Sequence, residues 1–454
     1  MDNTKLLNKR DILRVVIEAT TPIAVGSGEK DVETDARVVR DVNGLPYIPA
    51  TSLAGILRHA MGKAGAQCDL WGFQSADDGR GSRLMFTNAN LVRHDGTVVD
   101  GLPDIDLKDD EFLGRYLNLP IRQHVRIGHS GAAERHGKFD QEVVYAGSRF
   151  CFELEVAHGG EAASQVDEIV AALQCPTLRI GGSVYSGLGE FQVVSLKRAA
   201  LDLCDTGALA RYLDKSSSLD NAAWWSEPNI AQQTPIDDEK WQRYDISLQP
   251  VDFFMMGSGV GDDEADLTPV TEHRVEWGSG SGLFVENQVL IPATSVKGAL
   301  AHRVAFHHNR LAEKFADKLG KDESIEDFVG NMNKAVRALF GYELAGTSRP
   351  GRVMLSDVIL KPVDATVFNH VRIDRFTGGA MEGALFQEKV SAGQQEFTLT
   401  LLVEKSAFAV TYVKDALEAA IRDLITGMLP LGGAVNRGHG VFTGQCEQLN
   451  SNQQ

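Results

Sequence analysis

The chain repeats itself, and this internal repeat limits its fold more than any other feature of the sequence. The segment IPATSLAGILRH at residues 48–59 recurs as IPATSVKGALAH at 291–302, with eight of the twelve positions identical. Average residue usage gives less than about one chance identity over a segment of this length. Because the offset of 243 residues is long enough for a whole domain, the sequence predicts two domains of the same fold.

Four further blocks recur in the same order. They are GSG at 26–28 and 257–259, LWGF at 70–73 with LFGY at 339–342, HVRI at 124–127 and 370–373, and GGSVYSGLGEF at 181–191 with GGAVNRGHGVF at 432–442. The offset changes along the chain, and each change locates an insertion. The second copy gains 12 residues near 277–282 and 26 near 303–338, and the first copy holds 23 extra residues in the aspartate-rich stretch 92–121. We expect these insertions to decorate a common scaffold.

Each copy also has the same order of predicted elements. In the first copy, β-rich segments lie at 12–20, 83–92 and 150–157, a helix is expected near residue 51, and a second helix covers 164–174. The glycine-rich block then leads into a last strand. Strand–helix–strand–strand–helix–strand is the order of a ferredoxin-like fold, so we predict the α+β class with two tandem ferredoxin-like, RNA-recognition-type domains.

The predicted domains occupy residues 1–200 and 241–454, and a linker at 201–240 has no counterpart in either copy. Trp224 and Trp225 are expected to dock this linker onto a domain. The first helix of each domain is predicted to begin at an N-cap hydroxyl, and the candidates are Thr51 or Ser52 and Thr294 or Ser295.

Charge and cysteine content exclude several classes of protein. Forty-five Lys and Arg against 62 Asp and Glu give a net charge of −17, which argues against a generic basic coat for nucleic acid but allows local basic clusters. The five cysteines are scattered without a CxxC pair, so neither a zinc ribbon nor a disulfide framework is expected. The first residues lack the apolar core of a signal sequence, and no apolar run approaches ~18 residues, so we expect a cytoplasmic protein without a membrane partner.

The repeated blocks resemble the RAMP superfamily. The resemblance rests on GSGEKDVETDARVVRDVNGLPYIPATSLAGILR in the first copy, on GSGVGDDEADLTPVTE and VLIPATSVKGAL in the second, and on the turns SGLGEF and RGHGVF. The chain is more closely similar to two fused copies of the backbone subunit of type III CRISPR effector complexes, of the Csm/Cmr kind, in a type III-D-like arrangement. This resemblance implies a guide RNA, a complementary target RNA and other subunits of the complex as partners. It also implies a β-hairpin thumb in each domain, at 124–144 and 370–390.

Asp35 and Asp266 are the candidate catalytic residues, because they occupy matching positions at the offset of the GSG blocks. The resemblance implies that the aspartate at this position cleaves target RNA, once per repeat, with Mg²⁺ or another divalent metal that the same two residues would hold. A carboxylate can deprotonate a 2′-hydroxyl or bind a hydrated metal ion. The alternative is that both are ordinary solvated loop carboxylates. Further acids that could hold metal-bound water are Asp31, Glu33, Asp262, Asp263 and Glu264.

Candidate RNA-binding residues gather at the repeated blocks. In the first copy they are Arg37, Arg40, Ser52, Arg58, Arg122, His124, Arg126, Gly187 and Gly189, and in the second Ser295, Lys297, Arg303, His370, Arg372, Gly438 and Gly440. The arginines and lysine would pair with phosphate, the helix starts at the two serines would offer backbone N–H groups, and the glycines would let RNA approach the backbone. A histidine could instead be the base of a guide-processing nuclease, and we favour a phosphate-contacting role.

Three functions therefore stay open. The first is a guide-binding backbone subunit that also cleaves target RNA at two sites, the second a non-catalytic RNA-binding spine, and the third a guide-processing endoribonuclease. Because a guide varies in sequence, its holder is expected to contact phosphate and sugar and to leave specificity to base pairing. The two domains are expected to be related by a translation, since they must present successive equivalent sites to one RNA.

Overall fold

A computed structural model describes residues 7–29, 34–62, 70–102, 106–128, 130–160, 162–278, 280–320, 324–344, 346–393 and 395–450. Asp31 and Glu33, two of the acids considered for metal binding, lie outside these residues. Within them, no helix is long and apolar enough to cross a membrane.

The first domain is built on an antiparallel sheet of order β4-β8-β1-β9. Its strands are β1 (Lys9–Ala19), β4 (Leu84–Phe86), β8 (Arg149–His158) and β9 (Phe191–Asp202). Helices α1 (Ala50–Ala60) and α3 (Ala163–Leu173) contact each other and cover one face. Their apolar stripes, which include Leu53, Leu57, Val166 and Ile169, pack into the same core as the alternate buried residues of β1.

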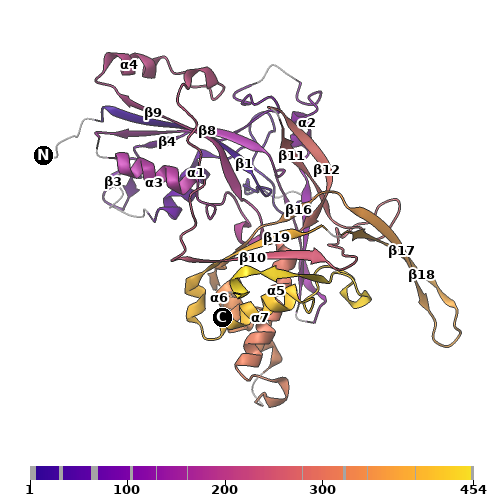
Figure 1. Cartoon of the computed structure of the whole chain (residues 1–454). Coiled ribbons are helices and arrows are strands. Elements are labelled where there is room, and N and C mark those ends of the chain that lie inside the picture. The colour runs from indigo at the N-terminus through magenta and orange to yellow at the C-terminus, as the bar shows by residue number, and fades with distance from the viewer. Residues whose placement is uncertain are drawn as a thin grey trace.

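The second domain repeats this plan. Its sheet has the order β15-β19-β10-β20, made by β10 (Trp241–Pro250), β15 (Val353–Leu355), β19 (Phe397–Glu404) and β20 (Phe442–Cys446). The helices are α5 (Ala293–Leu311), α6 (Lys334–Phe340) and α7 (Val413–Ile425). Figure 1 shows the two sheets in separate halves of the molecule, with α5, α6 and α7 on one side of the second. Both sheets have the strand order of a ferredoxin-like fold, so the predicted α+β class with two tandem domains is confirmed.

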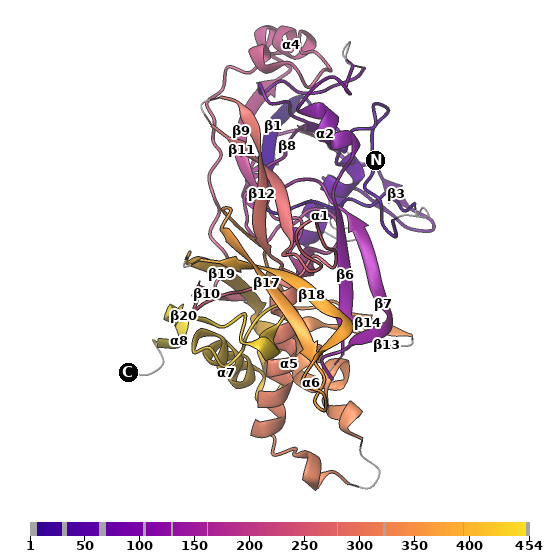
Figure 2. The ribbon, with the colours of Figure 1, turned by 90° about the vertical axis from the view of Figure 1, so that its right-hand side faces the viewer.

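Three long hairpins extend from the two sheets. The first is β6 (Ile121–Ile127) with β7 (Ala133–Glu142), and the second is β17 (Asp364–Ile373) with β18 (Ala380–Ala392). Both lie where the thumbs were predicted. In Figure 1 the β17–β18 hairpin projects from the body, whereas Figure 2 shows β6 and β7 running from the first domain alongside the second. The third hairpin, β11 (Thr271–Trp277) with β12 (Gly282–Ile291), occupies the insertion inferred near 277–282.

Short elements complete the described residues. They are β2 (Phe73–Gln74), β3 (Gly79–Arg80), β5 (Asn90–Leu91), α2 (Leu113–Leu117), α4 (Thr206–Leu213), β13 (Tyr342–Leu344), β14 (Thr347–Arg349), β16 (Val358–Leu360), α8 (Glu447–Asn450) and several single turns of 3₁₀ helix. The segment between β9 and β10 carries α4 and lies on the first domain, where Trp225 packs against Ile12, Ala199 and Leu201. The predicted docking of this segment through its tryptophans is confirmed.

The predicted N-caps are wrong, and the β-rich segment predicted at 83–92 is two short strands, as is its counterpart at 352–361. Helices α1 and α5 begin directly after Pro49 and Pro292, without a side-chain cap from their own segment. The first amide of α1 donates to Asn88 Oδ1 at 2.9 Å, and the first amide of α5 donates to Asp357 Oδ1 at 2.7 Å. These two residues interrupt the predicted strands, because the chain turns there to bring the side chain to the helix.

Candidate nucleic-acid interface

The two domains meet through non-equivalent surfaces. The glycine-rich turn of the first domain packs on the start of α5, so that a Cβ at Gly187 would lie 2.6 Å from the Ala293 Cβ. Gly438, the counterpart of Gly187 in the second domain, has no atom of the described residues within 4 Å of such a Cβ. A two-fold junction would bury both turns alike. The contact is therefore head to tail, as expected for domains that present successive sites along one RNA.

We call the two sides of this junction the glycine-turn face and the helix-start face. In the junction, the glycine-turn face of the first domain comprises Arg122, Arg179, Tyr185 and Gly187, and the helix-start face of the second comprises Glu272, Ala293, Lys297, Ser356 and Asp357. Lys297 Nζ donates to the Tyr185 carbonyl at 3.0 Å, and Arg179 donates to Ser356 Oγ at 2.9 Å. Burial lowers the pKa of the Lys297 ammonium.

A buried charge cluster lies at the centre of the junction. Arg122, on β6, donates to Glu272 and to Asp357 Oδ2, the second at 2.5 Å, and all three side chains are less than a tenth exposed. Burial opposes the charge of Arg122, but the carboxylates of Asp357 and Glu272 outweigh it and raise the pKa of the guanidinium. Since Asp357 also caps α5, one carboxylate joins the helix start to the hairpin of the other domain.

The second domain contributes a reciprocal contact. Phe284 of β12 packs among Phe112, Tyr116 and Tyr145 of the first domain, with ring centroids 5.0 to 5.7 Å apart. In β11, the Trp277 indole N–H donates to the Gly147 carbonyl at 2.8 Å. Each domain thus extends a hairpin onto the other, and the relative position of the two repeats is fixed on two sides.

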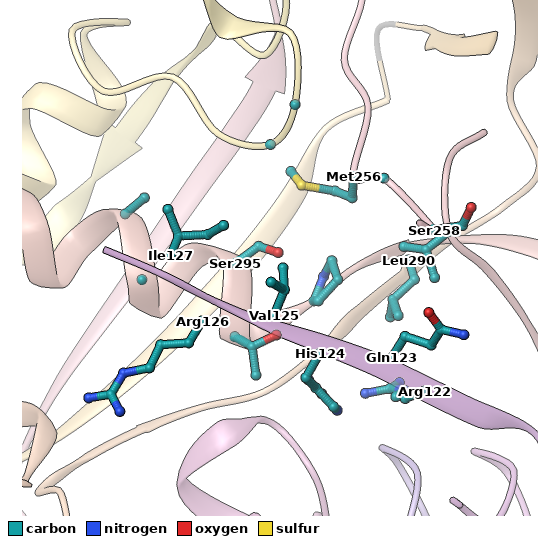
Figure 3. A pocket seen from close by; sticks show the side chains of 18 of the residues that line it. Arg122, Gln123, His124, Val125, Arg126, Ile127, Met256, Ser258, Leu290 and Ser295 are labelled. Carbon is teal, nitrogen blue, oxygen red and sulfur yellow. The ribbon is translucent and has the colours of Figure 1, made fainter. Parts of the chain in front are cut away.

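A groove with a volume of about 1080 Å³ lies beneath the first hairpin. Its walls are β6, the first turns of α5, the loop segment 256–260, residues 268–273 at the start of β11, and the glycine-rich loop 430–435. Figure 3 shows β6 crossing over the start of α5, with Gln123, His124 and Val125 on the strand and Ser295 on the helix. The groove therefore brings together the thumb of one repeat and the IPATS and glycine-rich blocks of the other.

The lining of this groove combines apolar side chains with polar and charged ones. It includes the hydroxyls of Ser258 and Ser295, the amide of Gln123 and the imidazoles of His124 and His302. His124 stacks on Phe139 at 4.8 Å, and its Nε2 is buried without a hydrogen-bond partner among the described residues. Burial, followed by the nearby Arg122 charge, lowers the pKa of His124. The imidazole is therefore neutral at physiological pH and offers one donor and one acceptor.

The second hairpin repeats part of this arrangement in the open. His370 stacks on Phe386 at 4.8 Å, as His124 does on Phe139, and its Nε2 lies 3.1 Å from Glu388. Arg437 of the glycine-rich turn donates to the same carboxylate at 2.5 Å. Arg372, further along β17, is exposed. The stacked histidine is thus a shared feature of the two thumbs, although only the first one is covered by a neighbouring domain.

The two candidate catalytic aspartates lie at matching places, against the bases of the two hairpins. Asp35 Oδ2 accepts from the Asp140 amide at 3.2 Å, and Asp266 Oδ2 accepts from the Gln387 amide at 2.8 Å. Both residues are exposed. One oxygen of each carboxylate therefore anchors its loop to the thumb, and the other has no hydrogen bond within the described part of the chain.

The described residues contain no group of three His, Cys, Asp or Glu side chains that could hold a metal ion. In the second loop, Asp262 and Glu264 lie 3.0 and 2.6 Å from the ammonium of Lys389. Mg²⁺ commonly binds through one or two carboxylates together with substrate phosphate and water. The chemistry of Asp35 and Asp266 thus fits a magnesium ion that RNA phosphate completes.

Several predicted RNA contacts are instead contacts within the protein. Arg40 donates to Glu142 and two carbonyls, Arg58 donates to the Gly72 carbonyl, and Arg303 is paired with Asp423. Lys297, Gly187 and Arg122 belong to the junction described above. Each of these residues therefore has a contact within the protein, and its contact with RNA stays a prediction.

The helix starts and two glycines also have other roles. The first amides of α1 and α5 are bound by Asn88 and Asp357, and the Ser52 and Ser295 amides donate to the carbonyls of Pro49 and Pro292. The aspartate would repel phosphate at α5, so a phosphate site there is not supported. At Gly189 and Gly440 a Cβ would lie 2.2 and 2.1 Å from a carbonyl oxygen of the same domain, which shows that both glycines close their own turn.

The remaining predicted residues lie where RNA can reach them. Arg37, Arg126 and Gly438 are exposed, as is Arg372, and the Ser295 side chain lines the groove. The sequence reasoning missed Asn88 and Asp357, although both stand at the offset of 269 residues that relates LWGF to LFGY. The signal in the sequence was a polar residue, Asn88 or Asp357, at the same place in each copy.

These features define a class of protein: two ferredoxin-like domains in tandem, each with a long hairpin beside a glycine-rich turn. A model of the RAMP superfamily matches residues 16–192 and 279–443, one stretch in each domain, and the chain belongs to this superfamily. RAMP proteins bind RNA and assemble with other CRISPR effector subunits, so the family indicates a CRISPR-associated RNA-binding subunit. No curated protein matches the chain.

Proposed function

We propose that the chain is a guide-RNA-binding backbone subunit of a type III CRISPR effector complex, equivalent to two fused backbone subunits, and that it also cleaves complementary target RNA once per repeat. The observation that supports this most is the groove of about 1080 Å³ beneath β6, where the thumb of one repeat meets the helix start and glycine-rich loop of the next. A single RNA strand that follows the head-to-tail order of the domains would pass through it.

The composition of the groove favours contacts to sugar and phosphate. Hydroxyls, an amide and a neutral imidazole can hydrogen-bond to a 2′-hydroxyl or a phosphate oxygen, and these are the contacts that the proposal assigns to them. The exposed arginines Arg37, Arg126 and Arg372 supply positive charge near the two hairpins. We expect affinity to fall with salt, and to be about equal for guides of different sequence.

In the proposed cleavage, Asp35 and Asp266 each act on one phosphodiester of the target. The carboxylate takes the proton of a 2′-hydroxyl, whose oxygen attacks the adjacent phosphorus. The bond to the 5′-oxygen of the next nucleotide breaks, which gives a 2′,3′-cyclic phosphate and, once a proton is supplied by water, a 5′-hydroxyl. A divalent ion bound by the same carboxylate and RNA phosphate would stabilise the developing negative charge.

The anchoring of each aspartate to a hairpin amide decides which variants test this proposal. Asp35→Asn keeps an oxygen for the Asp140 amide but removes the charge, whereas Asp35→Ala also removes the anchor. The same holds for Asp266 and the Gln387 amide. In the assembled complex with Mg²⁺ and labelled target, we expect each asparagine variant to lose one cut, keep the other, and bind target as before.

Full cutting by the Asp35→Asn/Asp266→Asn double variant would contradict the catalytic part of the proposal. The non-catalytic spine is the second candidate, and the anchoring itself favours it, because a carboxylate that holds a loop needs no other role. The spine predicts normal cutting in the asparagine variants. Cleavage of guide precursor that persists in EDTA and is lost in His124→Gln would instead support guide processing.

A further inference from the structure

The two loops that carry the candidate catalytic aspartates are bonded to the bases of the hairpins in the same way. In each repeat, the carbonyl of the residue after the aspartate accepts from a hairpin amide, that of Glu142 at 2.9 Å and that of Lys389 at 2.8 Å. The amide two places earlier, at Asp140 or Gln387, donates to the carboxylate of the aspartate. These two hairpin places therefore correspond between the repeats, although they carry different side chains.

In the first repeat, a hairpin carboxylate holds the loop. Asp140 Oδ1 accepts from the Asp35 amide at 2.7 Å, while Asp35 Oδ2 accepts from the Asp140 amide at 3.2 Å. This reciprocal pair of hydrogen bonds restrains both the backbone and the side chain of Asp35. Two residues further along β7, Glu142 Oε2 accepts from the Val38 amide at 2.8 Å and holds the next part of the same segment.

The second repeat has a different side chain at the place of Asp140. Gln387 stands there, and its side chain donates across the hairpin to Asn369 Oδ1 at 3.0 Å. The Asp266 carboxylate accepts from the Gln387 amide at 2.8 Å, as its counterpart does in the first repeat. The side chain that completes the reciprocal pair in the first repeat is therefore used for another contact in the second.

A cation holds the second loop instead. Lys389 Nζ lies 2.6 Å from Glu264 and 3.0 Å from Asp262, and these hydrogen bonds raise the pKa of the ammonium. Asp262 in turn accepts from the amides of Glu264 and Ala265, both at 2.9 Å, and so shapes the turn directly before Asp266. The ammonium thus ties this turn to β18, and it offsets the repulsion between carboxylates that lie close together in the loop.

We propose that Asp140 and Lys389 are positioning residues, which hold the proposed cleavage loops of the first and the second repeat by different interactions. Hydrogen bonds to the backbone hold the first loop, and ion pairs hold the second. Ion pairs near the surface weaken as salt rises, because the Debye length falls from about 10 Å at 0.1 M to about 3 Å at 1 M. The two cuts should therefore differ in their response to salt. The inference rests on the proposed cleavage and adds the residues that set each aspartate in place.

The first test follows both cuts in the assembled complex with Mg²⁺ and 5′-labelled target, under single-turnover conditions. We expect Asp140→Ala to slow the first cut about ten- to a hundredfold and to leave the second unchanged, and Lys389→Met to do the reverse. In each variant, the unaffected cut is the internal control for folding, assembly and target binding. Asp140→Asn keeps an oxygen that accepts from the Asp35 amide, and Lys389→Arg keeps the cation, so both should restore most of the rate.

The outcomes separate this inference from the proposed cleavage. An unchanged first cut in Asp140→Ala would overturn the role of Asp140, and an unchanged second cut in Lys389→Met would overturn that of Lys389. A loss in Asp140→Asn as large as in Asp140→Ala would also count against positioning, because the charge rather than the hydrogen bond would then be required. If the complex of the intact chain made neither cut, the proposed cleavage would itself be contradicted, and the inference with it.

The second test measures the anchoring without cleavage. In hydrogen–deuterium exchange of the full chain without RNA, Asp140→Ala should raise the exchange of residues 34–38 alone, and Lys389→Met that of residues 262–268 alone. In the cleavage assay, the rate of the second cut relative to the first should fall as NaCl rises from about 0.05 to about 0.5 M in the intact chain, and should stay low throughout in Lys389→Met. Unchanged exchange in both variants, or a rate ratio in the intact chain that does not depend on salt, would overturn the inference.

Discussion

Replacing Arg122 by methionine removes the only cation that contacts both Glu272 and Asp357 among the described residues. The side chains of the two acids are 7% and 1% exposed, so water cannot replace the guanidinium without opening the junction. Asp357 keeps the α5 amide at 2.7 Å, but Glu272 loses its partner. Breaking a buried pair on one side costs about 3–5 kcal/mol, and we expect Arg122→Met to destabilise the chain by this amount.

Urea unfolding and calorimetry measure the effect. Arg126→Met is a matched control, because Arg126 lies four residues along the same strand, is 57% exposed and pairs with Glu134 at 3.0 Å, and the loss of such a surface pair costs about 0–1 kcal/mol. We also expect the single unfolding transition of the intact chain to split, since the domains no longer stabilise each other. In Arg122→Met/Glu272→Met, part of the loss should be recovered, with a coupling of about 0.5–3 kcal/mol.

The reasoning would be refuted if Arg122→Met cost no more than the Arg126→Met control and kept a single transition. Such a result would mean that the junction is held by its apolar contacts alone.

Three further predictions concern the junction and the groove. Gly187→Ala should open the junction, because its Cβ would lie 2.5 Å from Asp357 Oδ1. Gly438→Ala, in open space at φ +92°, should cost only the backbone strain of about 1–2 kcal/mol. Small-angle scattering and unfolding midpoints compare the two variants. Because the pKa of His124 lies below its usual 6.5 in the folded chain, the unfolded chain binds more protons below that pH, so stability should fall as pH drops from 6.5, and less steeply in His124→Gln. Lys297→Met should change the free energy of unfolding by less than about 2 kcal/mol, because the lost hydrogen bond to a carbonyl is offset by the lower cost of burying a methionine. Urea unfolding of the variant and the intact chain measures this difference, and a larger loss would contradict the prediction.

The sequence by itself determined the repeat, the fold and the thumbs. Period-2 strands, amphipathic helices and glycine-rich turns are local patterns that a sequence shows directly. Because these patterns recur in the same order in both copies, each copy supports the prediction made for the other. The hairpins at 124–144 and 370–390 were implied by the resemblance of the repeated blocks to the RAMP superfamily. The offset arithmetic also located the insertions, but gave no sign that two of them pack on each other.

Only the tertiary structure decided which charged and polar residues serve the protein and which are left for RNA. Arg122 meets its carboxylates 150 and 235 residues away in the chain, and Arg303 meets Asp423 at a separation of 120. A sequence gives the sign of a charge but not the group that faces it, because that depends on how two distant surfaces come together. The charged residues Arg122 and Asp357 of the junction differ between the two copies, since Phe368 and Asn88 stand at the matching places, and a comparison of what the copies share could not reveal this contact.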